Sequence, residues 1–151
     1  MPNVTVQRDI AAPQSAVWAV LADFPNISDW NGGVTASHAT SDAVEGVGAQ
    51  RHCDLAPMGE LEETVLEWEP PRRMVVSIDA AKKIPVKTGR VTFTIDEGSD
   101  HSPTTLSYDF TAKGGVLAPL IGRVLTGQLR KGFSGFLEDL ERAAQGRTAA
   151  S

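Results

Sequence analysis

The sequence lacks the features that build disulfide-linked, membrane-spanning or nucleic-acid-binding proteins. It has one cysteine, Cys53, among 151 residues, so no disulfide forms within the chain. No apolar run approaches the roughly 20 residues that a bilayer-spanning helix needs. The 19 acidic residues outnumber the 14 basic ones, which gives a formal net charge of −5. That balance argues against a nucleic-acid partner, because phosphate binding needs a basic face.

The N-terminal residues MPNVTVQRDI contain no basic region followed by an apolar core, so we expect no signal peptide. With the single cysteine, this predicts a cytoplasmic protein without stable membrane insertion. The length fits one compact domain, which we assign to residues 1–145, with 146–151 as a frayed tail. The sequence does not decide between a monomer and a homodimer.

Motifs of the common hydrolases, metalloproteases and nucleotide-binding enzymes are also missing. The three histidines are far apart in sequence, and no spacing suggests converging metal ligands. We therefore expect no metal and no other cofactor. Cys53 is expected to be a small buried apolar residue rather than a nucleophile. His52 and Asp54 share one strand face, which we expect to point outward.

The sequence does contain a regular order of secondary-structure patterns. Alternating apolar and polar residues predict a strand at 3–10, and apolar residues at helical spacing predict a helix at 13–23 that Pro25 ends. Short turns separate the later strands, which predicts an antiparallel meander. These strands are expected at 34–41, 48–56, 60–69, 73–81, 86–96 and 104–112. Residues 116 to about 145 predict one long helix, with an apolar side marked by Leu125, Leu129, Phe133, Phe136, Leu137 and Leu140.

Three stretches resemble one superfamily over nearly the whole chain: IAAPQSAVWAVLADFPNISDWN, ETVLEWEPPRRMVVSI and KGGVLAPLIGRVLTGQLRKGFSGFLEDLERAA. They are similar to segments of the START-like helix-grip (SRPBCC) superfamily, which includes the polyketide cyclase/dehydrase family. The resemblance implies an α+β helix-grip fold, in which a curved antiparallel sheet of about seven strands wraps on the long C-terminal helix. It also implies two short helices after the first strand and an internal cavity. It does not fix an activity, because the superfamily includes lipid carriers, cyclases, hydrolases and co-chaperones.

Within this fold, the segment FPNISDWNGG at 24–33 becomes a second short helix, at about 26–30, ended by the glycine pair. The two short helices would form a V that supports the end of the long helix. Trp30 would lie where the V meets the next strand. It is expected there either as a wall of the cavity or as structural packing.

Glycines in the long helix are consistent with a cavity between this helix and the sheet. On a helical wheel Gly122 and Gly132 fall within the apolar face, Gly127 on the opposite side and Gly135 near the margin. Each glycine costs ~1 kcal/mol against alanine in a helix interior. A glycine on the buried face lets either a sheet side chain or a ligand approach the backbone.

Strands 48–56 and 60–69 place charged residues on an otherwise apolar face. A turn at Pro57-Met58-Gly59 would put Cys53 opposite Glu63, with Arg51 diagonally adjacent to Glu63. The expected inward face carries Arg51, Cys53, Leu55, Leu61, Glu63 and Val65, with a bulge near Glu67. The pair either orients the polar end of a ligand or meets water at the sheet rim.

The predicted function is binding of a small hydrophobic molecule, such as a lipid, isoprenoid or polyketide-like compound, in a cavity of at least several hundred Å³. The expected ligand contacts are Trp30, Arg51, Glu63, Phe93, Tyr108, Phe110, Leu117, Ile121 and Leu125. Tyr108 is either a ligand contact or, as is more often the case for a buried tyrosine, an ordinary core residue. No catalytic residue is assigned.

Two alternatives remain open. One is a cyclase/dehydratase-like enzyme, in which Glu63, Arg51 or Tyr108 aids proton transfer. The other is an interaction module, which would need a large exposed apolar patch. The segment MVVSIDAAKKIPV is the one candidate for such a patch, and an ordinary strand and loop would explain it as well.

Overall fold

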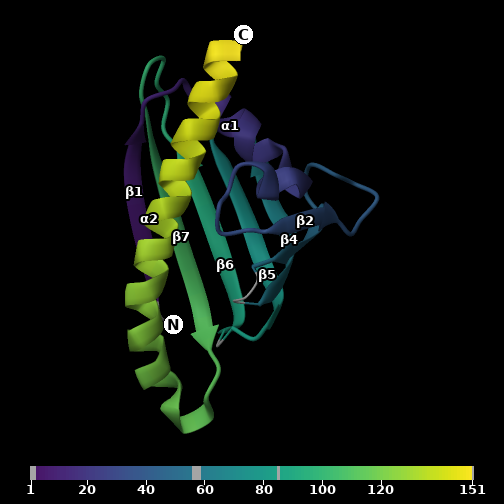
Figure 1. The fold of residues 1–151 in the computed structure, drawn as a ribbon, viewed down its shortest axis with the longest axis vertical. Helices are drawn as coiled ribbons and strands as arrows, with labels where there is room; N and C mark the ends of the chain where they lie inside the picture. Colours follow the sequence, from purple (N-terminus) through teal and green to yellow (C-terminus); the bar gives the residue numbers. More distant parts are fainter. Residues whose placement is uncertain (1–2, 56–58, 85, 151) are drawn as a thin grey trace.

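The computed structural model describes residues 3–55, 59–84 and 86–150, in which seven antiparallel strands form one sheet (Figure 1). The strand order is β1-β7-β6-β5-β4-β3-β2, so each strand from β2 to β7 lies beside its neighbour in sequence, and β1 pairs with β7. The strands are β1 Asn3–Ile10, β2 Ala36–Ala39, β3 Gln50–Asp54, β4 Glu60–Glu69, β5 Arg73–Lys82, β6 Val86–Ile95 and β7 Ser102–Ala112. The helices are α1 Gln14–Ala22, the 3-10 helices η1 Phe24–Asp29 and η2 Gly115–Leu117, and α2 Ala118–Ala150.

The expected order of strands and helices is confirmed, with local differences at their ends. β2 and β3 are shorter than predicted, because residues 40–49 leave the sheet in a long loop in which Gly46 and Gly48 have positive φ. The short helix η1 begins at Phe24, two residues before the expected start. At the C-terminus α2 continues to Ala150, beyond the expected end near residue 145. Within the described ranges, no helix is long and apolar enough to cross a membrane.

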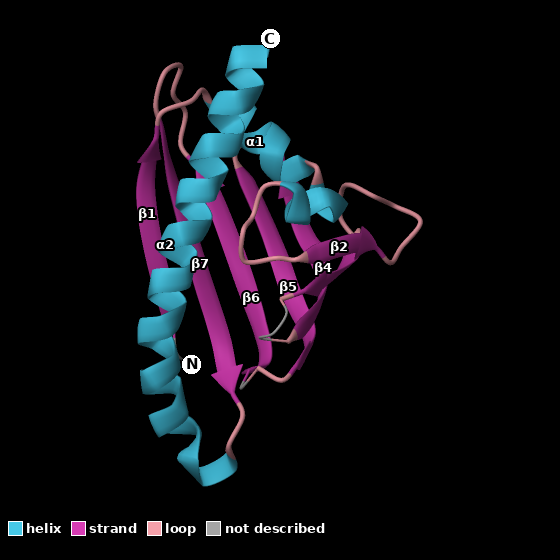
Figure 2. Ribbon diagram, viewed as in Figure 1, coloured by secondary structure: helices cyan, strands magenta, loops and turns pink. Residues whose placement is uncertain are grey.

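The long helix α2 crosses one face of the curved sheet, and the core lies between them (Figure 2). Alternation along β7 sets which side chains enter this core: every second residue from Ser102 to Ala112 is buried. From the helix side, Leu125, Leu137 and Leu140 are at most 7% exposed. The alternating residues of β7 and the apolar residues at helical spacing along α2 are therefore buried in the same core, as the sequence predicts.

The short helix α1 lies beside the C-terminal half of α2, as expected, while η1 packs against β2 and β3 (Figure 1). Glu141 of α2 fastens this end: its carboxylate accepts hydrogen bonds from the Ala11 backbone N–H and the Arg8 guanidinium, both at 2.8 Å. Burial alone would raise the pKa of Glu141, but these two donors outweigh it and lower the pKa. Asp23, between α1 and η1, forms a further ion pair with Arg147 of α2 at 3.7 Å.

The register of the hairpin β3–β4 differs by two residues from the expected one. Arg51 lies directly opposite Glu63, and Cys53 lies opposite Leu61. A shift of two residues keeps every side chain on its face, because side chains alternate with a period of two. The inward face was thus predicted correctly from a wrong register, and the bulge is confirmed between Val65 and Glu67. Pro57 and Met58 of the predicted turn lie outside the described residues.

The helix glycines lie partly where the helical wheel places them. Gly122 is buried, Gly127 is exposed and Gly135 is half-buried, as expected. Gly132 was placed on the apolar face but is exposed, and a Cβ built there would meet nothing within 4 Å. The buried stripe of α2 is centred on Leu137 and Leu140, so Gly132 falls outside its edge.

Candidate functional site

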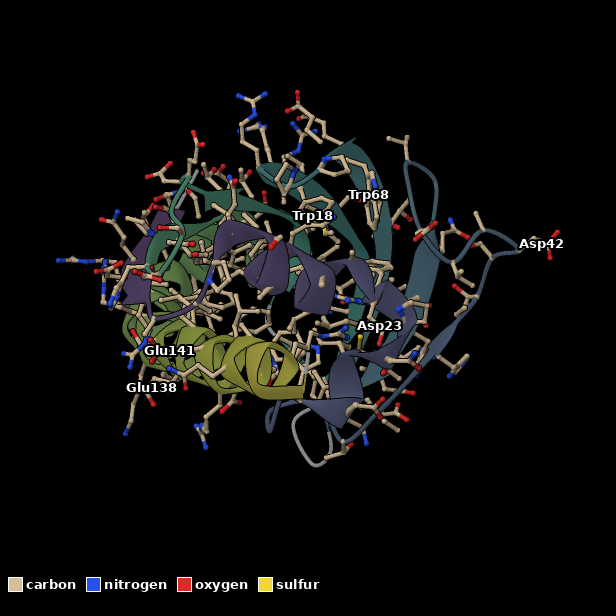
Figure 3. The ribbon with its side chains drawn as sticks, turned by 90° about the horizontal axis from the view of Figure 1, so that it is seen from above. Trp18, Asp23, Asp42, Trp68, Glu138 and Glu141 are labelled. Atoms are coloured by element: carbon tan, nitrogen blue, oxygen red, sulfur yellow. The ribbon has the colours of Figure 1, made fainter. Side chains whose placement is uncertain are left out.

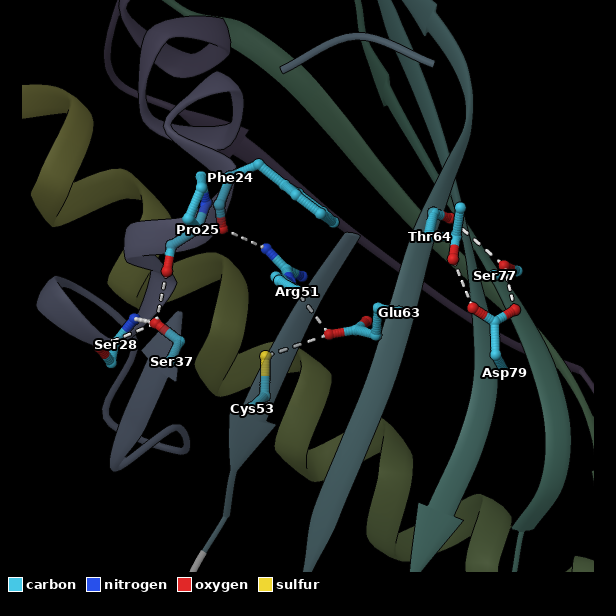
Figure 4. Close-up of polar contacts among 10 residues, drawn as sticks. All are labelled: Phe24, Pro25, Ser28, Ser37, Arg51, Cys53, Glu63, Thr64, Ser77 and Asp79. Atoms are coloured by element: carbon cyan, nitrogen blue, oxygen red, sulfur yellow. Dashed lines mark hydrogen bonds and ion pairs between the residues drawn. The ribbon is translucent and has the colours of Figure 1, made fainter. Parts of the chain in front are cut away.

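A buried ion pair lies at the inner face of the sheet, where β3 meets β4 (Figure 4). Arg51 Nε donates to Glu63 Oε1 at 3.0 Å, and the two residues are 6% and 7% exposed. Cys53, one pleat along β3, contacts the same carboxylate oxygen at 3.3 Å. Of the two alternatives for this pair, a position at the wet rim is therefore wrong.

The arginine is held on its other side by Phe24, the first residue of η1. Arg51 Nη1 donates to the Phe24 backbone carbonyl at 2.9 Å, and the guanidinium carbon lies 3.9 Å from the centre of the Phe24 ring. A carboxylate, a carbonyl and an aromatic face thus compensate the charge in the interior. These contacts fix Arg51 between the sheet and the V of short helices.

Trp30 contributes an unpaired donor close to this arginine. Its ring packs edge-on against Phe136 of α2, with centroids 5.1 Å apart. The indole Nε1 is buried and, within the described part of the chain, has no hydrogen-bond partner. Because buried polar groups are nearly always paired, an unpaired indole N–H points to an acceptor that is supplied from elsewhere.

Trp30 and Arg51 line the same internal pocket, between the short helices, the sheet and α2. The other residues of its wall are Val20, Leu21, Asp23, Phe24, Ile27, Met74, Phe93 and Phe136. The pocket holds about 10 Å³, room for about one water molecule. The expected several hundred Å³ is not found here, because Phe136 packs between Trp30 and Phe93, with the Phe93 and Phe136 rings stacked 5.5 Å apart.

The residues predicted to contact a ligand do not all gather at this pocket. Trp30, Arg51 and Phe93 line it, and Glu63 adjoins it through Arg51. Tyr108, Phe110 and Leu125 are core residues farther along the sheet and helix, and Ile121 is half-buried.

Leu117 is misplaced by the prediction: it is 58% exposed, because η2 carries the chain beyond the end of the sheet. Conversely, Phe24, Met74 and Phe136 of the pocket wall were not singled out as ligand contacts. Their positions in apolar periodic patterns made them look like ordinary core.

Tyr108 belongs to an aromatic group beside the pocket. Its ring stacks on Phe110 at 5.2 Å and meets Phe133 of α2 edge-on at 5.3 Å. Burial, and after it the negative charge of Glu63, raises the pKa of the Tyr108 hydroxyl. The phenol therefore stays protonated at neutral pH and is able to donate, not to act as a base. Burial likewise raises the pKa of the Cys53 thiol, so Cys53 is no thiolate nucleophile.

A larger depression of about 760 Å³ lies on the other side of η1 and opens to solvent. Mostly polar and small residues of α1, η1, β2, the β2–β3 loop and the end of α2 form its wall, including Asn26, Ser37 and Glu45. It contains no buried donor without a partner among the residues described. We regard it as a surface groove rather than as the ligand site.

The outer face of the sheet brings together the groups that could hold a metal ion. His52 Nε2 lies 2.9 Å from Asp54 Oδ1 and 3.3 Å from Glu60 Oε1, and His52 Nδ1 contacts Glu62. Hydrogen bonds to Glu62 and Asp54 raise the pKa of His52. This cluster confirms that His52 and Asp54 face outward. Imidazolium–carboxylate pairing accounts for it, so we assign no metal there.

Comparison with known proteins agrees with the fold. The model of the family described as polyketide cyclase / dehydrase and lipid transport matches residues 1–145. The chain therefore belongs to this family. No curated protein matches the chain.

Solved structures of similar fold include three that each cover nearly the whole chain. A protein of Thermus thermophilus has a TM-score of 0.80 at 15% identity, over 97% of this chain and 99% of its own. The Zhui aromatase/cyclase of a Streptomyces species has a TM-score of 0.78 at 19% identity, over 97% and 94%. A START superfamily protein of Mycobacterium smegmatis has a TM-score of 0.71 at 17% identity, over 97% of both chains. At these identities the likeness establishes the helix-grip fold.

Proposed function

We propose that the protein binds a small hydrophobic molecule between the sheet and α2, and that an oxygen of this ligand accepts a hydrogen bond from Trp30 Nε1. The observation that carries the proposal is the buried indole N–H, which has no acceptor among the residues that the structure describes. A buried donor left unpaired costs about 1–3 kcal/mol, which a ligand acceptor would recover on binding. The family, whose description includes lipid transport, supports the same class of ligand.

The surroundings of Trp30 support one class of ligand. Besides the neutral indole N–H of Trp30, the pocket wall contains the positively charged guanidinium of Arg51. Met74, Phe93 and Phe136 supply apolar contact. A largely apolar molecule that carries a ketone or carboxyl oxygen matches this wall. A lipid, isoprenoid or polyketide-like compound has that composition.

Ligand entry requires the pocket to widen, because it holds only about 10 Å³ as it stands. The side chain that fills it, Phe136, follows a stretch of α2 with glycines at 127, 132 and 135, at each of which a Cβ would meet no atom within 4 Å. These glycines have no packing role, and each weakens the helix by ~1 kcal/mol relative to alanine. We infer that this stretch of α2 yields to let Phe136 leave the pocket.

A thermal-shift screen with fatty acids, isoprenoids and aromatic polyketones, followed by native mass spectrometry, tests the proposal. A true ligand should raise the melting temperature and appear as a one-to-one complex. Trp30→Phe should lose affinity by about tenfold, since it removes the donor and retains most of the ring. Trp68→Phe is the matched control, because Trp68 packs against Trp18 outside the pocket, with ring centroids 5.1 Å apart (Figure 3). Equal affinity of both variants would contradict the proposal.

A cyclase/dehydratase-like enzyme is the second candidate. The convergence of Arg51 and Glu63 within 3.0 Å favours it, together with the protonated phenol of Tyr108 on the same side of the sheet. Incubation with a linear polyketone and mass spectrometry would detect loss of water. Product formed by the wild-type protein but not by Tyr108→Phe would support this activity, and product formed equally by both would exclude Tyr108 as the acid.

A further inference from the structure

The basic residues of this protein fall into two groups. Eight of the 14 lie in the segments 80–95 and 110–137, which contain no aspartate or glutamate. They are Lys82, Lys83, Lys87, Arg90, Lys113, Arg123, Arg130 and Lys131. The other six share the rest of the chain with all 19 acidic residues. Although the protein has a net charge of −5, it contains two segments in which every charged residue is basic.

The two groups also differ in their partners. Each of the six arginines outside these segments forms an ion pair with a carboxylate. In the part of the chain that the structure describes, none of the eight basic side chains inside them does so. Lys113 and Arg130 donate instead to backbone carbonyls, of Ala81 and Thr5. The positive charge of the two segments is therefore not neutralised by neighbouring carboxylates.

An exposed apolar patch lies at the end of the molecule where these segments meet. Val116, Leu117, Leu120 and Val124 form it, and they are 96%, 58%, 60% and 61% exposed. They belong to η2 and the first turns of α2, at the lower end in Figure 1. The β5–β6 turn reaches the same end, because Val86 pairs with Ala112 and Lys113 Nζ donates to the Ala81 carbonyl at 3.0 Å.

The charged residues of the two segments that carry and flank this apolar patch are all basic. Lys82, Lys83 and Arg123 are exposed, and Lys113 is half-buried. Of the nearby strand carboxylates, Glu60 lies opposite Lys82 on β4 and pairs with His52 at 3.3 Å, while Asp79 and Asp109 accept hydrogen bonds from hydroxyl and amide donors. Figure 3 views the opposite end, where Asp23, Asp42, Glu138 and Glu141 are labelled. Several of the acidic residues thus lie away from the end that carries the apolar patch.

We propose that this end docks on the surface of an anionic lipid bilayer. The valine and leucine side chains of the apolar patch would enter the boundary between headgroups and acyl chains, where exposed apolar area is removed from water. Lysine and arginine around them would meet the phosphate groups, since basic residues near an anionic leaflet are attracted over about a Debye length. The lysine stems are long enough to stay on the apolar surface while their ammonium groups reach the headgroups.

Other occupants fit this surface less well. A dimer in which both copies make contact through this same end would bring like charges together. A nucleic acid would leave the four apolar side chains against phosphates, which reward only the basic ones. A second exposed apolar pair, Val44 and Val47 at 53% and 66%, lies in the β2–β3 loop beside Asp42 and Glu45. Val44 and Val47 are about as exposed as Leu120 and Val124, but their charged neighbours are acidic instead of basic. The pair therefore supplies a matched control.

Flotation with vesicles of phosphatidylcholine alone, or of phosphatidylcholine and phosphatidylserine in equal parts, tests the proposal on the full chain. We expect binding to the mixed vesicles, weakened on the order of tenfold when phosphatidylserine is omitted or salt is raised. Leu120→Ser/Val124→Ser and Lys82→Gln/Lys83→Gln should each weaken binding by a similar factor. Val44→Ser/Val47→Ser should bind as the wild type does. All of these changes are at exposed positions, and circular dichroism checks that each variant is folded.

Three results would overturn the proposal. The first is equal recovery of the protein with both kinds of vesicle, and the second is a Val44→Ser/Val47→Ser variant whose vesicle binding is weakened as much as that of Leu120→Ser/Val124→Ser. The third is the formation of dimers or RNA complexes through this end while vesicles are not bound. Trp30→Phe, which changes the internal pocket, should bind vesicles like the wild type. Failure of the vesicle experiment is thereby separable from failure of the proposed ligand site.

Discussion

Arg51 and Glu63 lie directly opposite each other on β3 and β4 and form an ion pair at 3.0 Å in which neither residue is more than 7% exposed. Removing one partner of such a buried pair leaves an uncompensated charge, which typically costs about 3–5 kcal/mol of stability. We expect Arg51→Met and Glu63→Leu each to lose about that much in urea unfolding. The double variant should lose less than the sum, because it leaves neither charge unpaired. Strict additivity of the two single losses would contradict an energetically coupled pair.

Trp30 combines a packing role with an unpaired donor, so two substitutions should separate these roles. Trp30→Ala removes the contact with Phe136 and should destabilise the protein by about 3–5 kcal/mol. Trp30→Phe keeps most of the ring and removes the buried N–H, so the ligand-free protein should lose no more than about 1 kcal/mol. Calorimetry of both variants measures this. A loss for Trp30→Phe as large as that for Trp30→Ala would show that the indole N–H is satisfied after all.

Two glycines should respond to alanine with opposite signs. A Cβ at Gly89 would lie 2.6 Å from the Tyr108 hydroxyl and 2.4 Å from its ring, so Gly89→Ala must displace a buried tyrosine. We expect a loss of about 1–3 kcal/mol, as for other overpacked cores. At Gly127, on the exposed side of α2, nothing lies within 4 Å, and alanine should stabilise the protein by up to about 1 kcal/mol. Urea midpoints of the two variants test both signs, and a Gly127→Ala loss would mean that this glycine has a packing partner.

His52 should make stability depend on pH. Hydrogen bonds to Glu62 and Asp54 raise its pKa in the folded protein. A raised folded pKa stabilises the protein fully below the unfolded pKa of about 6.5, and this contribution is lost as pH rises through the folded value. The stability difference between the wild type and His52→Gln should therefore be largest in mild acid and shrink toward alkaline pH.

Melting temperatures measured across that range test the prediction for His52. His101→Gln, in the β6–β7 connection, controls for the removal of an exposed imidazole. A difference that grows with rising pH would show that the pKa of His52 is lowered by the fold, not raised.

Much of the fold was predictable because it depends on periodic patterns that local sequence carries. The alternation along β7 and the apolar spacing along α2 specify which side of each element is buried. The inward position of Arg51 and Glu63 followed from the same alternation. Their direct pairing did not, since a hairpin shifted by two residues has the same faces, and the number of residues in its turn decides between the registers.

Pocket size and surface character depend on elements that meet only in the folded chain. Phe136 of α2, Phe93 of β6 and Trp30, just after η1, come from three separate parts of the chain, and their side chains together reduce the pocket to about 10 Å³. Leu117 shares an apolar run with Ile121 and Leu125, yet η2 carries it past the sheet into solvent. The sequence by itself determined the succession of strands and helices along the chain, the long helix and the uneven distribution of charge. Tertiary packing decided which apolar residues were covered, because burial depends on whether another element lies opposite, and no local pattern records that.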